Sequence, residues 1–422
     1  MATPPGSDTR TPAEVVEHFF RHEAGRLTAT LVRSFGLKNL ALAEDIVQET
    51  LLKALDYWRY HPLPDNPTAW LYRAARNRAL DQLRRQQYTE RPEDDALLHR
   101  QAGTTPEGEL LLEGEIGDSQ LRMMFACCTP ELPTEAQLML ILKTLCGFSV
   151  REIARAFLQN EEAVAKRLYR ARKTLAESGF SLELPPEVFA GPRLPTVLLA
   201  LYLLFTEGYN ATETEDFLRE DLAAEALRLG ALLTHSPATA QPEVFALLAL
   251  MSFHAARFPA RRGAGGKIVL LEDQDRSQWH PALIAQGLAY FEQAMTAQTL
   301  STYHLEAAIA AAHTTAPSLA ATDWPLIRQY YELLYQQKPT PVVALNRAVV
   351  ISKIEGPTAA IPLIEALPGY DKHHLFLSVL AQLELQSGNT PRARAHWQRA
   401  LAICPSPRER ELIAEKLAQL GA

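Results

Sequence analysis

The chain has 422 residues, an ordinary globular composition of 47% hydrophobic and 22% charged residues, and a formal net charge of −7. Its length favours two to four domains, and its acidic balance excludes a uniformly basic nucleic-acid-binding protein. The four cysteines have neither disulfide-scaffold density nor metal-binding spacing, and no run of eighteen apolar residues occurs. We therefore expect a reduced, cytoplasmic protein without a membrane span, a metal or a cofactor.

The charge is unevenly distributed along the first 180 residues. Residues 90–118 carry nine acidic residues against two arginines, whereas the rest of residues 1–180 has 21 Lys and Arg against 16 Asp and Glu. The remaining chain is acidic and has no comparable basic helix. Any contact with DNA is therefore expected within residues 1–180.

Helical periodicity runs through almost every segment, which predicts an all-α fold. Residues 12–60 predict two helices broken near Gly36, and apolar residues of the second helix form one broad face (Leu42, Ile46, Leu51, Leu52 and Leu55). The proline-rich residues 61–68 predict a turn before a helix that contains Trp70.

The helix from Trp70 to Arg85 mixes aromatic and basic side chains. Such a surface suits single-stranded nucleic acid, because rings stack on bases and guanidinium groups pair with phosphates. Its candidate contacts are Trp70, Arg73, Arg76, Asn77, Arg84 and Arg85. The alternative for Trp70 is a core anchor at the start of the helix.

A helix-turn-helix is predicted at residues 149–175. Ser149 and Glu152 fit a capping box that opens the first helix, Leu158 and Gln159 form the turn, and Asn160 caps the second helix. Helices joined in this way place the second helix in the major groove of DNA.

The second helix of this motif has two distinct faces. Its packing stripe is Val164, Leu168, Ala171 and Leu175. Its other face carries five cations that can neutralise phosphates: Lys166, Arg167, Arg170, Arg172 and Lys173. The alternative is a solvated basic helix inside a bundle.

The C-terminal part, residues 181–422, contains a weak repeat. Gly356 and Gly388 open two similar segments, and the Ala-Leu pairs that close these segments lie 34 residues apart. This period is typical of tetratricopeptide repeats. The alternative is a plain antiparallel helical domain.

Three patterns that suggest catalysis or metal binding are incomplete. Residues 263–268 lack the leading glycine and the Ser or Thr of a phosphate-binding loop, so we interpret them as a turn. His18 and His22 have no third ligand. The acidic cluster at 272–277 has no nucleophile and base, so we interpret it as a buried polar network or a partner-binding loop and expect no enzyme.

Several of these segments resemble the bacterial sigma-70 family, in the order found there. Residues 43–55 resemble its polymerase-binding helix, and residues 66–85 resemble the segment that melts and reads the −10 promoter element. Residues 131–137 and 149–175 resemble the module that reads the −35 element. With only these two modules, the chain resembles the extracytoplasmic-function (ECF) group.

The resemblance implies roles for individual residues. Asp45, Gln48 and Glu49 would face the clamp of core RNA polymerase, with Leu52 beneath them. The alternative is a solvated helix face. The loop 60–68 would capture a flipped base of the −10 element, while Trp70 wedges against the duplex edge. The acidic segment 90–118 would thread the basic channels of the polymerase or serve as a disordered spacer.

Residues 201–212, 270–279 and 343–349 resemble the long tetratricopeptide-like extension of one ECF subgroup. That resemblance suggests a small YCII-related (DGPF-type) protein as a partner. One departure is Leu158, where family members usually have glycine, so the −35 sequence preference does not transfer.

The predicted organisation therefore has four parts, with a polymerase- and −10-binding module at 11–89 and an acidic linker at 90–118. A −35-binding helix-turn-helix module follows at 119–180, and a helical regulatory extension occupies 181–422. The predicted function is a sigma factor that directs promoter recognition and transcription initiation. The alternative is a helix-turn-helix regulator whose C-terminal domain senses a ligand or a partner.

Overall fold

The computed structural model describes residues 12–90, 113–157, 159–178, 182, 191–209 and 218–420. These residues form helices and no strand, apart from an isolated antiparallel bridge between Arg262 and Ile268. The predicted all-α fold is therefore confirmed. Among the helices in these ranges, none combines the length and the apolar character needed to cross a membrane. The chain divides into two compact units, Met1–Ala200 and Leu201–Ala422.

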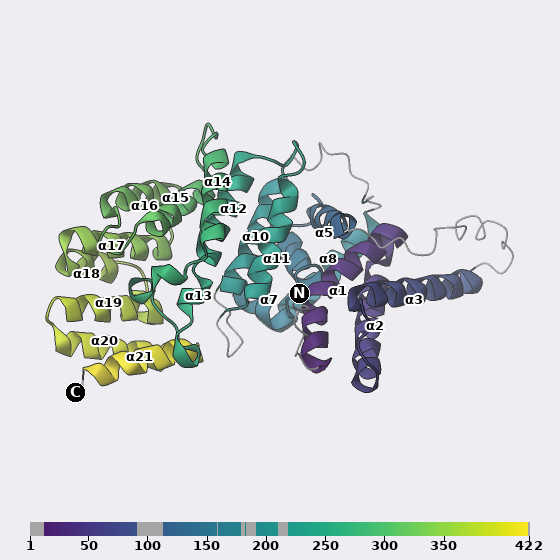
Figure 1. Ribbon diagram of the computed structural model, residues 1–422, viewed down its shortest axis with the longest axis horizontal. Helices are drawn as coiled ribbons and strands as arrows, with labels where there is room; N and C mark the ends of the chain where they lie inside the picture. Colours follow the sequence, from purple (N-terminus) through teal and green to yellow (C-terminus); the bar gives the residue numbers. More distant parts are fainter. Residues whose placement is uncertain are drawn as a thin grey trace, which may run out of the picture. The chain divides into compact units, whose positions relative to one another are not determined.

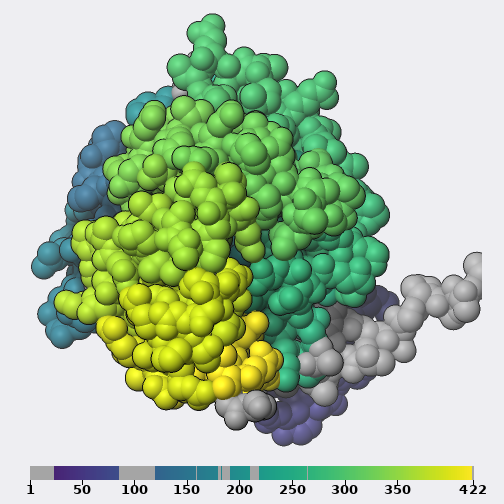
Figure 2. Space-filling model, turned by 90° about the vertical axis from the view of Figure 1, so that its left-hand side faces the viewer, coloured from purple at the N-terminus to yellow at the C-terminus, as the bar shows by residue number. Residues whose placement is uncertain are grey.

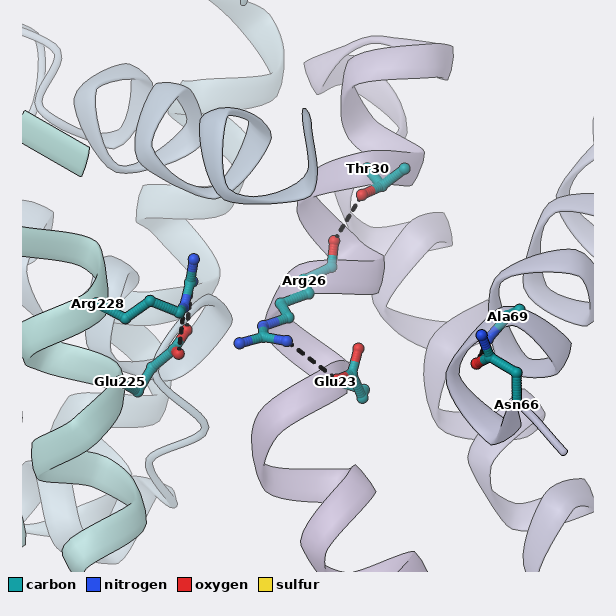
Figure 3. A network of polar contacts seen from close by, with 7 residues as sticks. All are labelled: Glu23, Arg26, Thr30, Asn66, Ala69, Glu225 and Arg228. Atoms are coloured by element: carbon teal, nitrogen blue, oxygen red, sulfur yellow. Dashed lines mark hydrogen bonds and ion pairs between the residues drawn. The ribbon is translucent and has the colours of Figure 1, made fainter. Parts of the chain in front are cut away.

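The first unit begins with two long helices and a third that follows a loop. They are α1 (Pro12–Phe35), the 3-10 turn η1 (Leu37–Asn39), α2 (Leu40–Tyr60) and α3 (Pro67–Glu90). The predicted break lies at Gly36, whose φ of +86° favours glycine. Asn66 caps α3, because its side-chain oxygen accepts the Ala69 N–H at 2.9 Å (Figure 3).

Helix α2 packs on α1 and α3 along one apolar stripe. Ile46, Leu51, Ala54 and Trp58 of α2 are all buried. The predicted broad face is wrong for Leu52, whose side chain is 54% exposed. Its place in the helix explains this, because Leu52 lies between the buried stripe and the charged face.

The second part of this unit consists of α5 (Glu113–Cys127), α6 (Thr134–Thr144), α7 (Val150–Ala156) and α8 (Glu161–Glu177). Helix α5 begins within the segment predicted as linker, and residues 91–112 of that segment lie outside the described residues. The predicted capping box is confirmed: Glu152 N–H donates to Ser149 Oγ at 3.0 Å, and Ser149 N–H donates to Glu152 Oε2 at 2.6 Å. Asn160 caps α8 by accepting the Ala163 N–H at 2.7 Å.

The end of the first unit extends beyond the predicted boundary at residue 181. Arg122 of α5 donates to the Leu182 carbonyl at 3.4 Å, and Arg193 donates to the Phe125 carbonyl at 3.4 Å. The division between the two units falls inside α10 (Leu194–Tyr209), whose residues Val197 and Leu198 are fully buried.

The second unit is built from helices joined by short turns (Figure 1). They are α11 (Glu220–Leu233), α12 (Pro242–Ala255), α13 (Phe258–Arg261), α14 (Pro281–Ala294), α15 (Thr302–Thr315), α16 (Trp324–Gln337), α17 (Pro341–Glu355), α18 (Pro357–Glu365), α19 (His374–Gln386), α20 (Thr390–Ile403) and α21 (Pro407–Gln419), with the 3-10 turns η2 (Ala264–Gly266), η3 (Leu271–Asp273), η4 (Arg276–Gln278) and η5 (Tyr370–Lys372).

From α15 to α21 each helix packs against the next one in the chain. One face of α19 contributes Phe376 and Leu380 to a cluster shared with α18. Another face contributes Leu377 to a cluster shared with Trp397 of α20. Gly356 lies between α17 and α18 and Gly388 lies between α19 and α20, with φ of +92° and +84°.

Two half-buried histidines give the second unit a pH-dependent stability. Burial, followed by the charge of Arg257, lowers the pKa of His254 to about 3 and that of His313 to about 4. Below pH ~6.5 the unfolded chain takes up protons that these folded histidines do not bind. The unfolding free energy of this unit should therefore fall with decreasing pH, by at most ~1.4 kcal/mol per histidine per pH unit.

Urea denaturation monitored by circular dichroism, at pH values between about 7 and about 4.5, measures this dependence. We expect His254→Phe to flatten the curve, because the ring then packs on Tyr209 without titrating. The exposed His235, changed to Phe, is the matched control and should leave the slope unchanged. If the unfolding free energy of His254→Phe depends on pH as steeply as that of the parent protein, His254 is not a source of the pH dependence.

Candidate nucleic-acid interface

The outward face of α8 carries four of the five predicted cations. Val164, Leu168, Ala171 and Leu175 are buried as predicted. Opposite them, Lys166, Arg167, Arg170 and Lys173 are exposed. Within the described ranges, the guanidinium group of Arg170 has no ion-pair partner, so its charge is available to a ligand.

The other three outward cations form surface ion pairs. Lys166 pairs with Glu162 at 2.6 Å, Arg167 with Glu135 at 2.5 Å, and Lys173 with Glu177 at 3.9 Å. The side chains in these pairs are about half exposed or more, and such pairs contribute only ~0–1 kcal/mol. Phosphate oxygens can therefore replace the carboxylates at little cost.

Arg172 does not lie on this outward face, which corrects the prediction. Its side chain is 28% exposed, and its Nε lies 2.9 Å from Oε2 of Glu44 on α2. Its Nη2 also donates to Oε1 of Glu44 at 3.1 Å. The helical period explains the difference, because Arg172 is next to the buried Ala171 and borders the packing stripe.

Glu44 joins the two halves of the first unit. Its Oε1 also accepts the Thr144 hydroxyl of α6 at 2.9 Å. Nearby, α1 approaches the end of α6 so closely that a Cβ at Gly25 would lie 2.9 Å from the carbonyl carbon of Leu145. Arg33 of α1 donates to Ser119 of α5 at 3.2 Å. The two modules are therefore packed against each other in this structure.

A second cationic surface lies on α3. Arg73, Arg76, Asn77 and Arg84 are exposed and fall at spacings of three, four and seven, which place them along one side of the helix. Arg84 lies 3.9 Å from Asp81, a weak surface pair. The side chain of Arg85, the sixth predicted contact of this helix, lies outside the described residues.

Trp70 lies in an aromatic cluster at the start of α3. It is half-buried, with its ring 5.9 Å from that of Tyr57 and 5.5 Å from that of the buried Trp58. Tyr57 also stacks on His61 with ring centroids 4.0 Å apart. Trp70 is therefore partly an anchor and partly accessible, a combination that neither predicted alternative described.

Three tyrosine side chains among the described residues are exposed, of which the sequence prediction included only residue 60, as the first residue of the loop 60–68. Tyr57 is 48% exposed and Tyr60 is 79% exposed, both at the end of α2 beside the proline-rich loop. Tyr169 is 71% exposed on α8, between outward cations. The signal that could have identified them is their position off the apolar packing stripe, next to the basic residues of their helices.

The predicted polymerase-binding residues share one face of α2. Asp45 and Gln48 are exposed, and Glu49 is half-buried and ion-paired with Arg78 of α3. Leu52 lies on the surface next to them, rather than beneath them as predicted.

Figure 3 also shows ion pairs that fix individual helices in each unit. In α1 the Arg26 side chain pairs with the buried Glu23 at 3.2 Å, while its carbonyl accepts the Thr30 hydroxyl. In α11 Arg228 makes two hydrogen bonds to Glu225, at 2.7 and 2.8 Å. These contacts are structural, and none of them belongs to the cationic faces of α3 and α8.

A helix-turn-helix with a cationic outward face, joined to a second module with a basic and aromatic helix, defines a two-module DNA-binding protein. Comparisons with known families agree. Residues 19–89 match sigma-70 region 2, residues 122–175 match sigma-70 region 4, and residues 193–295 match a family of unknown function (DUF6596).

The chain is also 38% identical to an uncharacterised protein of Rhizobium meliloti (strain 1021) over 397 residues, which cover 93% of this chain and 92% of the relative. No solved structure matches the chain. The chain belongs to the sigma-70 family, whose members are transcription initiation factors that bind core RNA polymerase and promoter DNA. The alternative of an ordinary helix-turn-helix regulator does not account for the match to region 2.

Proposed function

We propose that this protein is an ECF-type sigma factor whose helical extension regulates its activity in the cytoplasm. The observation that carries the proposal is the outward-facing Arg170, which has no ion-pair partner among the described residues, with its exposed cationic neighbours on α8. Helix α8 would lie in the major groove of the −35 element, where these side chains reach phosphates and base edges. The ECF assignment is supported by the two sigma-70 modules that this chain matches, regions 2 and 4, which are the pair on which the resemblance to the ECF group rests.

The α3 surface suits the other promoter element. Single-stranded DNA presents unstacked bases, which bind aromatic rings, and phosphates, which bind guanidinium groups. The exposed Tyr57 stacks beside Trp70, and Tyr60 is exposed at the end of α2, while Arg73 and Arg76 follow along α3. We infer that this surface holds the melted −10 strand, with the loop 60–68 receiving a flipped base.

The test is run-off transcription with sigma-free core polymerase and a pool of candidate promoters that includes the region upstream of the protein's own gene. Transcripts that depend on this chain and start at defined sites would support the proposal. Core binding without any transcript would support an autoinhibited factor. An absence of both core binding and transcripts would overturn the proposal.

A charge reversal on α2 tests the polymerase-binding face. We expect Asp45→Arg to weaken binding to core polymerase by about 100-fold, because a cation would replace a carboxylate at the interface. Asp45 is exposed, so folding should be unaffected. Binding is measured by fluorescence anisotropy of the labelled full-length chain.

The matched control for this reversal is Asp371→Arg, which makes the same change in charge at an exposed site of the extension. Its affinity for core polymerase should equal that of the parent protein. Equal binding by Asp45→Arg and the parent would remove Asp45 from the interface, although another part of α2 could still contact the polymerase.

The extension is the proposed site of regulation, and a small YCII-related (DGPF-type) protein is its proposed partner. A stack of helical hairpins presents a long surface for contacts. Co-purification of the tagged full-length chain with such a protein tests the partner. Failure to co-purify would remove this partner and leave the role in initiation intact.

A further inference from the structure

The second unit contains a cavity of about 570 Å³ between the last helices of the stack. Three helices each contribute one face to it, at spacings of three, four and seven residues. The lining residues are Asn346, Val349, Val350 and Lys353 from α17, Leu375, Ser378, Val379 and Gln382 from α19, and Glu409, Leu412, Ile413 and Lys416 from α21. A cavity of this volume is in the usual range for small-molecule sites.

A segment of the connection between α13 and α14 covers one side of the cavity. This segment follows the glycine turn at residues 263–266. It contributes Ile268, Leu270, Leu271 and Glu272 to the wall of the cavity. Glu272 pairs with Lys353 of α17 at 3.3 Å, and Lys267 pairs with Glu415 of α21. Figure 2 shows the face on which the yellow C-terminal helices lie beside this teal-green segment.

Most of the lining is apolar, and aromatic rings are part of it. Trp324 and Tyr331 of α16 and Trp397 of α20 contribute to the wall. Leu375 is 49% exposed and Leu270 is 37% exposed, although both line the cavity. Covering such surface with an apolar ligand gains ~25 cal/mol per Å².

The charges in the wall are nearly all paired. Glu272 neutralises Lys353, and Glu409 accepts a hydrogen bond from His374 at 2.7 Å. Lys416 is half-buried and, within the part of the chain that the structure describes, forms no ion pair. The side chains of Ser378 and Gln382 likewise have no hydrogen-bond partner among the described residues.

We propose that this cavity binds a small organic anion with an apolar body, whose carboxylate or sulfonate group pairs with Lys416. The apolar walls favour a ligand with an apolar body. The ammonium group of Lys416 favours a ligand with a negative charge, because a hydrogen bond to an anion stabilises a half-buried cation. Most lining residues lie beyond residue 295 and so outside the matched families. The inference is independent of the role in transcription, because ligand binding is measured directly.

The probe is 1-anilinonaphthalene-8-sulfonate, which combines two aromatic groups with one sulfonate and fluoresces in apolar surroundings. Titrated into the full-length protein, it should bind saturably at one site. N-phenyl-1-naphthylamine, which lacks the sulfonate, is the neutral counterpart. Decanoate should displace the anionic probe, whereas 1-decanol should do so much less effectively.

Two kinds of variant locate the site. Val349→Trp and Ser378→Phe place bulk into the cavity from two different helices, and each should abolish the saturable signal. Lys416→Gln should weaken the anionic probe by about tenfold and leave the neutral probe unchanged. The matched control is Lys372→Gln, an exposed lysine of the same unit outside the cavity, which should behave like the parent.

Circular dichroism and melting temperature establish that each variant folds. The proposal is overturned if the parent shows no saturable binding, or if both cavity-filling variants fold and bind the probe normally. It is also overturned if Lys416→Gln weakens the neutral and the anionic probes equally, since the lysine would then act on the fold and not on the ligand charge.

Discussion

Replacing Lys166, Arg167, Arg170 and Lys173 by glutamine is expected to reduce promoter affinity of the holoenzyme by about a thousandfold at moderate salt. Each cation that meets a phosphate releases counterions, so affinity falls with salt in proportion to the number of such contacts. Removing four should lower the slope of log affinity against log salt by about three to four. All four side chains are exposed, and glutamine is a good helix former, so α8 should persist.

The control for this experiment is Arg172→Gln. A cation count from sequence gives Arg172 the same weight as Arg170, whereas in the structure Arg172 borders the buried packing stripe of α8 and lies off the face that carries the four exposed cations. We therefore expect Arg172→Gln to leave the salt slope near that of the parent, while Arg170→Gln lowers it by about one. A quadruple variant that keeps the parent slope would show that another surface carries the DNA contacts.

Gly25→Ala is expected to separate the two modules of the first unit. A Cβ at this position meets the backbone of Leu145, which cannot rotate away as a side chain does. Alanine favours a helix interior over glycine by ~1 kcal/mol, so α1 itself should gain stability. The substitution therefore destabilises the contact between the two modules, which includes the ion pair of Glu44 with Arg172.

The measurement is energy transfer between dyes on cysteines introduced at Lys53 of α2 and Tyr169 of α8, both exposed. All four native cysteines are buried, so labelling is selective. We expect a large fall in transfer for Gly25→Ala and a smaller one for Glu44→Gln. Gly230→Ala is the matched control, because its Cβ meets the end of a flexible leucine side chain. Unchanged transfer in Gly25→Ala would refute the close packing.

A separation of this kind has a functional meaning under the proposed function. The −10 and −35 elements are different segments of the promoter, so two modules that hold both at once cannot remain in contact through Glu44. The closed arrangement would then be a state of the free protein. Faster core binding by Gly25→Ala than by Gly230→Ala is the corresponding expectation.

Local chemistry made the helix-turn-helix predictable. The Ser149 and Glu152 capping box, the Asn160 cap and the stripe from Val164 to Leu175 all depend on residues within a few positions of each other. Such contacts form whenever the helix forms, so sequence is sufficient.

Contacts between distant segments were not predictable. Leu52 faces solvent because α1 and α3 cover a narrower stripe of α2 than apolarity alone suggested. Trp70 is half-buried because Tyr57 and Trp58 happen to lie beside it across a loop. Hydrophobic patterns identify a buried face but do not fix its edges, and these residues lie at the edges.

The sequence by itself determined that this protein is helical, where its helix-turn-helix is capped and that its basic helices lie in the first 180 residues, because periodicity, capping and charge order are local properties. The resemblance to a sigma factor rests on the order of whole motifs along the chain. The tertiary structure alone decided that Arg172 pairs with Glu44 and that His374, Cys404 and Glu409 meet from three segments. It also decided that α17, α19 and α21 enclose a cavity containing Lys416. The ion pair, the cluster and the cavity all depend on how separate helices pack against each other. No regular spacing in the sequence marks the side chains that such packing brings together.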